Sequence, residues 1–220
     1  MESSSSLINI TGENNIILLD NCVLLSSLNS NPLQSHSSLE KAIEYERNYA
    51  NGLLDILNSS SVFITSQIQS EFSKGFGVIR FKFGNLAFCE NSSLDFRKKI
   101  GSLQRSYFNI AKRLKSKTLS TLERNNSYLS HFVKIQEIVQ KSKYSNMITD
   151  CDIGLYAMAS FLNITQESAI ITRDFDLLRI HNLCSIDSNF NLENGFGICN
   201  KIYMPINSNE NLTHEYRLFH

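Results

Sequence analysis

The sequence lacks three features that would assign it to a secreted or membrane-spanning class. Its five cysteines form no Cys-x-x-Cys pair and are odd in number, which disfavours a disulfide framework or a cysteine-based zinc site and favours reduced, buried thiols. No window approaches about 18 uninterrupted apolar residues, so we expect no transmembrane helix. The N-terminal stretch has an acid and a serine run where a signal peptide needs positive charge and an apolar core. We therefore expect a cytoplasmic protein, or a nuclear one if the source is eukaryotic, with no membrane partner.

Net charge is also missing, because 21 basic and 21 acidic residues cancel. The charges are nevertheless segregated along the chain. Residues 74–117 hold eleven basic residues and two acids, a balance of +9, so the remainder carries −9. The basic segment suits a polyanion such as nucleic acid, and the acidic remainder suits a bound cation.

Short apolar runs alternate with helical patterns, which predicts an α/β fold. Continuous apolar runs at 16–19, 62–65 and 168–172 read as buried parallel strands, and an amphipathic helix is expected over 38–58. The segments 184–190 and 201–206 are expected to add strands, the second with Pro205 near an edge. At 220 residues the chain suits one domain, 1–220.

Residues 74–145 read as an insertion within that domain. In "GFGVIRFKFGNLAF", phenylalanines alternate with Arg80 and Lys82, which suits either base stacking or a glycine-flanked hairpin with Phe76, Phe81, Phe83 and Phe88 in the core. A basic amphipathic helix capped by Ser92 or Ser93 follows. A second helix, about 127–142, is expected to bury Leu129, Phe132, Val133, Gln136 and Val139. Together these two helices predict an inserted basic helical hairpin.

Acidic residues recur at the ends of the expected elements. Asp20 follows the first strand, Asp150 and Asp152 open an apolar helix, and Asp174 and Asp176 follow the strand at 168–172. Glu71 lies one to two turns into a helix that Ser66 caps. Each acid alone is explained by helix capping or surface exposure. Collected at the carboxyl ends of parallel strands, they would repel one another unless a divalent cation were bound.

In their order along the chain, these acidic motifs resemble those of the PIN-domain nucleases. The family pattern is a strand ending in Asp, a Glu on a later helix, an Asp followed seven residues on by Ala, and a strand closing with Thr-x-Asp-x-Asp. Asp152 with Ala159, and Thr172 with Asp174 and Asp176, match it well. The resemblance covers about 16–72 and 146–206. It implies a three-layer α/β/α fold with a mostly parallel central sheet.

The resemblance also implies a metal-dependent endoribonuclease. Asp20, Glu71, Asp152 and Asp174 would be the catalytic residues. Asp20, Asp152, Asp174 and Asp176 would be the metal ligands, with Asp150 a helix cap. An all-oxygen set favours Mg²⁺ or Mn²⁺ over zinc, because soft ligands and imidazoles lie outside the motifs. The RNA substrate would be held by basic residues of the insertion, namely Arg80, Lys82, Lys98, Lys99, Arg105, Lys112 and Arg113.

One departure leaves an alternative open. The family usually follows its first aspartate with Ser or Thr and then Asn, whereas this chain has Asn21 and Cys22. The alternative is a catalytically weak or inactive PIN-like module that binds RNA or acts as a scaffold. A phosphotransferase with an aspartate nucleophile would want Asp-x-Asp after the first strand, which is missing. The sequence does not separate a toxin, with an antitoxin or a second copy as partner, from an RNA-processing or defence enzyme.

Overall fold

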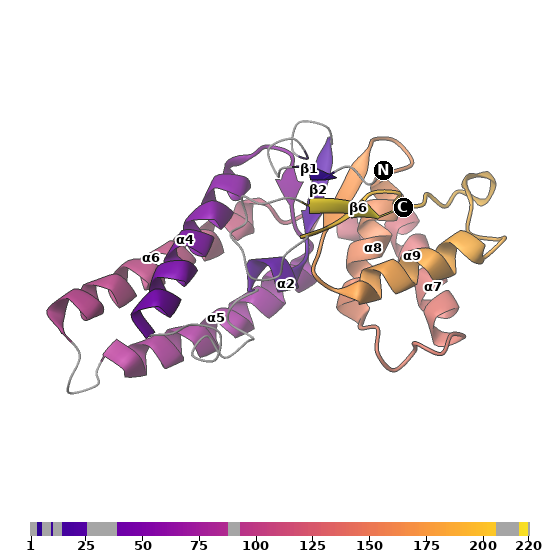
Figure 1. Ribbon diagram of the computed structural model, residues 1–220. Coiled ribbons are helices and arrows are strands. Elements are labelled where there is room, and N and C mark those ends of the chain that lie inside the picture. The colour runs from indigo at the N-terminus through magenta and orange to yellow at the C-terminus, as the bar shows by residue number, and fades with distance from the viewer. Residues whose placement is uncertain are drawn as a thin grey trace.

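The structure is a computed structural model that describes residues 4–5, 10, 15–25, 39–87, 93–205 and 216–219. A six-stranded sheet in the order β1-β6-β5-β4-β2-β3 forms its centre (Figure 1). The strands are β1 (Ser4–Ser5), β2 (Ile16–Leu19), β3 (Val62–Phe63), β4 (Ser168–Ile171), β5 (Ile202–Pro205) and β6 (Tyr216–Phe219).

The middle of the sheet is parallel, as the continuous apolar runs predict. β2 pairs in parallel with both β3 and β4, and β4 pairs in parallel with β5. All four residues of β2 and of β4 are buried, which is the pattern of parallel strands covered on both faces. β6 and β1 then add antiparallel strands at one side. The expected α/β class with a mostly parallel sheet is confirmed.

Helices lie on both sides of this sheet (Figure 1). On one side are α4, α5 and α6, which pack together, and α2 contacts α5; on the other, α8 packs against both α7 and α9. Their bounds are α2 (Asn21–Leu24), α4 (Leu39–Asn58), α5 (Ser66–Ala87), α6 (Leu94–Ser116), α7 (Asn126–Gln140), α8 (Asp150–Leu162) and α9 (Phe175–Ile186), with short 3₁₀ turns η1 (Leu122–Arg124) and η2 (Leu192–Asn194).

Of the two interpretations of the segment after residue 74, the glycine-flanked hairpin is wrong, because α5 continues to Ala87. Phe76 stacks on Phe72 one turn earlier, with ring centroids 6.2 Å apart, and also contacts Tyr107 of α6. A Cβ atom on Gly75 would come within 2.5 Å of the Leu25 side chain, so this glycine allows close packing rather than a turn. Phe88 and the side chains of Phe81 and Phe83 lie outside the described residues.

The two helices of the insertion do not form a hairpin. α6 starts after the cap Ser93 and buries its apolar face against α4 and α5. α7 instead packs on α8 and α9, at the opposite side of the molecule (Figure 1). Both segments are helices, as their periodicity predicts, but an amphipathic pattern does not specify which neighbour covers the apolar face.

The buried face of α7 also differs from the expected one. Tyr128, His131 and Ile135 are buried, whereas Leu129 and Val133 are 45% and 51% exposed. The ring of His131 explains the difference, because both of its nitrogens find partners inside the protein. Nδ1 lies 2.7 Å from the Ser127 carbonyl oxygen, and Nε2 accepts a hydrogen bond from the Gly197 N–H at 3.2 Å. Burial lowers the pKa of His131, so the ring is neutral and donates through Nδ1.

The C-terminal third contains two further corrections. Residues 184–190 are not a strand, because α9 continues to Ile186 and a turn follows. The strand expected at 201–206 is present as β5, but it lies between β4 and β6 rather than at an edge. Pro205 is tolerated there as the last residue of the strand, opposite Tyr216.

Candidate active site at the carboxyl ends of the parallel strands

Asp20 and Thr172 lie side by side because they follow two adjacent parallel strands. Leu19 of β2 is in register with Ile171 of β4, so the residues after them leave the sheet at the same edge. The Thr172 hydroxyl donates a 2.6 Å hydrogen bond to Asp20 Oδ2 and accepts one from the Asp174 N–H at 2.9 Å. Thr172 is fully buried and therefore fixes both aspartates relative to the sheet.

The residues after Asp20 make two further contacts in the site. The Cys22 thiol donates to Asp20 Oδ2 at 2.8 Å and accepts from the Arg173 N–H at 3.0 Å. Burial and the charge of Asp20 raise the pKa of Cys22 well above its ordinary value, so the thiol keeps its proton and remains a donor. The Asn21 amide donates to Glu71 Oε2 at 3.1 Å, which brings α5 to the same place.

Asp152 is held by a capping box at the start of α8. Its Oδ2 accepts hydrogen bonds from the backbone N–H and the hydroxyl of Thr149, at 2.9 and 2.6 Å, while Thr149 caps the helix through the Asp152 N–H. These bonds do not use Oδ1. Burial raises the pKa of the neighbouring Cys151 thiol, and the charge of Glu71 and a hydrogen bond with Glu71 add to this rise. The N-terminal turns of α5 and α8 are thus in contact.

The two acids of the last motif have different surroundings. Asp174 caps α9 by accepting from the Asp176 N–H at 2.9 Å. Asp176 forms an ion pair with Arg179, one turn along the same helix. Asp150 is exposed and accepts a 3.3 Å hydrogen bond from Gln136. Asp174 therefore belongs with the gathered acids, and Asp176 and Asp150 have partners of their own.

The electrostatics show that these carboxylates affect one another. Burial raises the pKa of Asp20, and the charge of Asp174 adds to this rise. The pKa of Asp152 is raised to about 6, mainly by burial and further by the charges of Asp20 and Asp174. Among the described residues, the ion pairs of Asp95, Asp176 and Glu167 lie elsewhere, and none involves Asp20, Glu71, Asp152 or Asp174. Asp20, Glu71, Asp152 and Asp174 are therefore gathered without a cationic side chain bonded to any of them.

The donor atoms are of the kind that binds a hard divalent cation, but they are too far apart to coordinate one ion together. The four acids and the Asn21 amide supply oxygen, and the buried Asn21 Oδ1 has no hydrogen-bond partner. Among the described residues, no three Asp, Glu, His or Cys side chains lie close enough together to hold a metal ion as they stand. Carboxylates separate when nothing offsets their charge, so a bound cation would have to draw them inward.

The basic residues expected to bind RNA lie on two helices outside the acidic site. Arg80 and Lys82 are on α5, and their side chains lie outside the described residues. Lys98, Arg105, Lys112 and Arg113 are exposed on α6. Lys99, also on α6, forms an ion pair with Asp95 one turn earlier.

Sequence reasoning missed the thiols and hydroxyls that orient the acids. Cys22 and Cys151 were expected to be inert core residues, and soft atoms were expected to be absent from the site. A usable signal was present for Cys22, since it lies two residues after Asp20, within reach of the same strand end. Thr149 with Asp152 is likewise a capping box that can be read from the sequence.

Comparisons with protein-family models, curated proteins and solved structures gave no match. Among the described residues, none of the helices has the length and apolar character needed to cross a membrane.

Proposed function

We propose that the chain is a metal-dependent endoribonuclease with a PIN-like three-layer α/β/α fold. The observation that supports this best is the gathering of Asp20, Glu71, Asp152 and Asp174 where β2 and β4 end. These acids come from four separate elements and share no cationic partner among the described residues. Such an arrangement costs stability on its own, and a bound divalent cation would offset that cost.

In this proposal Asp20, Asp152 and Asp174 hold Mg²⁺ or Mn²⁺, and Glu71 orients a water. The cation would supply an activated water and stabilise the leaving oxygen of the phosphodiester. The chain itself supplies orientation. Cys22 and Thr172 fix Asp20 through Oδ2, and Thr149 fixes Asp152 through its Oδ2 in the same way.

The test is cleavage of a mixed single-stranded RNA pool in Mn²⁺ by the wild type and by Asp152→Asn. We expect the variant to lose activity by about a hundredfold or more, since changes even in residues that only orient ligands cost 10–100-fold. Asp150→Asn is the matched control, because Asp150 lies at the same helix end but is exposed and bonded to Gln136. Equal rates for wild type and Asp152→Asn, or activity that survives a chelator, would refute the proposal.

The second candidate is an RNA-binding or scaffold module without catalysis. It is favoured by the absence of a closed group of three ligands among the described residues. Calorimetry with Mn²⁺ separates the two functions. Heat of binding that disappears in Asp152→Asn supports the nuclease, and a folded wild type that binds no Mn²⁺ supports the scaffold.

A further inference from the structure

One face of α6 carries a row of exposed cations around an exposed aromatic ring. Lys98, Arg105 and Lys112 recur every seventh residue, so they lie close to one line about 21 Å long. Phe108 lies between Arg105 and Lys112, three and four residues away, and Lys115 follows seven residues after it. We call these five residues the basic stripe. It faces away from the buried side of α6, whose residues include Leu103 and Tyr107.

The charges of the basic stripe are not neutralised within the described part of the protein. None of its four cations is bonded to an acid there, and the ion pair on α6 joins Lys99 to Asp95 instead. Like charges spaced along one helix repel one another and reduce stability slightly. A polyanion would remove that repulsion and would release its own counterions.

The exposed ring of Phe108 distinguishes this helix face from one that carries charges only for solubility. Its side chain is 62% exposed, although the same helix buries Phe96 and Tyr107. An exposed phenyl ring flanked by Arg and Lys is the combination on which an unpaired base stacks while its phosphates are neutralised. Lys112 of the basic stripe also lines a hollow of about 690 Å³ between α4 and α6, together with Arg113 and the amides Asn58 and Asn109.

We propose that the basic stripe binds single-stranded RNA, with Phe108 stacked on a base and Lys98, Arg105, Lys112 and Lys115 on phosphates. The choice of RNA rests on the proposed function, whereas the choice of a single strand rests on Phe108. Bases within a duplex are stacked on one another and leave no face for the ring. The residues of the stripe are distinct from the acids of the site, so binding requires no divalent cation.

The first test measures binding of a labelled single-stranded RNA in chelator, over a range of salt concentrations. Each phosphate contact contributes about 0.7 to the slope of log affinity against log salt for a single strand. Lys98→Gln, Arg105→Gln and Lys112→Gln together should therefore lower the slope by about 2. The matched control is Arg124→Gln, Lys134→Gln and Lys141→Gln, which removes the same charge around α7. An equal loss of slope in both triple variants would overturn the proposal, because it would indicate a general field effect.

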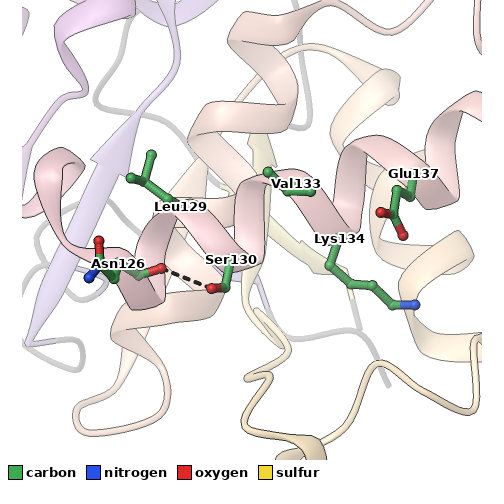
Figure 2. A pocket seen from close by; sticks show the side chains of 6 residues that line it. All are labelled: Asn126, Leu129, Ser130, Val133, Lys134 and Glu137. Atoms are coloured by element: carbon green, nitrogen blue, oxygen red, sulfur yellow. Dashed lines mark hydrogen bonds between the residues drawn. The ribbon is translucent and has the colours of Figure 1, made fainter.

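The second test isolates the ring. Phe108→Ala should weaken RNA binding about tenfold with the salt slope unchanged, and Phe108→Tyr should restore it. The control is Leu129→Ala, on an exposed face of α7 that also carries Ser130, Lys134 and Glu137 (Figure 2). Duplex RNA of the same sequence should bind more weakly than the single strand. If Phe108→Ala binds like the wild type, or if duplex and heparin compete as well as the single strand, the proposal fails.

Failure of this proposal and failure of the nuclease proposal give different results. If a variant of the basic stripe binds RNA as the wild type does and still cleaves it, only the role of the stripe is refuted. A wild type that binds single-stranded RNA through the stripe but never cleaves it in Mn²⁺ refutes only catalysis. All of the substituted stripe residues are exposed, so the variants should keep the wild-type circular dichroism spectrum.

Discussion

At the scale of single residues, the site contains a thiol that acts as a hydrogen-bond donor to a buried carboxylate. Cys22 donates to Asp20 and accepts from the backbone of Arg173, so it links the ends of β2 and β4. Cys22 therefore supplies a hydrogen-bond donor to Asp20 from two residues along the chain. The amide of Asn21 has a different partner, Glu71.

This geometry predicts opposite results for two substitutions of Cys22. Cys22→Ser keeps a small donor beside Asp20, so RNA cleavage and Mn²⁺ affinity should stay within a few fold of the wild type. Cys22→Ala removes a hydrogen bond to a charged group, worth about 1.5–3 kcal/mol, and should lower both by about tenfold or more. Calorimetry and initial rates measure the two effects. If the alanine variant equals the serine variant, Cys22 is only a core residue.

At the scale of elements, the local sequence pattern predicts where helices and strands lie better than it predicts which elements they pack against. The strand at 16–19 and the helices starting at Leu39 and Leu94 agree with the structure. The phase of α7 could not be predicted, because His131 is drawn inward by Gly197, which is 66 residues away. The length of α5 was missed because Gly75 looks like a turn signal unless the position of Leu25 is known.

Gly197 provides a test at this scale, because backbone fills the space where a side chain would be. A Cβ atom there would lie 2.2 Å from the Ser160 carbonyl oxygen, and a carbonyl in α8 cannot move aside cheaply. Gly197→Ala should lower the free energy of unfolding by about 3 kcal/mol, measured by urea denaturation. Gly101→Ala is the control, since no atom lies within 4 Å of its Cβ position. It should be neutral or stabilise α6 by about 0.5–1 kcal/mol. If Gly197→Ala lowers the free energy of unfolding only slightly, the loop around residue 197 can move away from α8 at little cost.

At the scale of the whole molecule, the acidic site should couple stability to pH and to divalent cations. The pKa of Asp152 rises from 3.8 to about 6 on folding, so the folded state binds its proton more tightly than the unfolded chain does. The stability that this proton provides is complete below pH 4 and is lost as the pH rises through 6. His131 acts in the opposite direction, because burial lowers its pKa and acid therefore favours the unfolded chain.

The difference in the free energy of unfolding between wild type and Asp152→Asn isolates the contribution of Asp152, since His131 is present in both proteins. In chelator, the free energy of unfolding of the wild type should fall relative to the variant by up to about 3 kcal/mol between pH 4 and pH 7. With Mn²⁺ at a hundred times its dissociation constant, the wild type should gain about 2.7 kcal/mol at pH 7.5 and the variant should gain little. Parallel pH curves in chelator would show that Asp152 titrates as an ordinary surface acid.

The pairing of β2 with β4 has a consequence for how the protein is made. Asp20 and Thr172, which hydrogen-bond at the heart of the site, are separated by 152 positions in the chain. During synthesis from the N-terminus, the whole segment between these two residues must therefore be translated before the acids can assemble. A truncated product that ends before β4 would leave β2 without a central neighbour. Any activity of this site is thereby delayed until β4 and the residues that follow it have been synthesised.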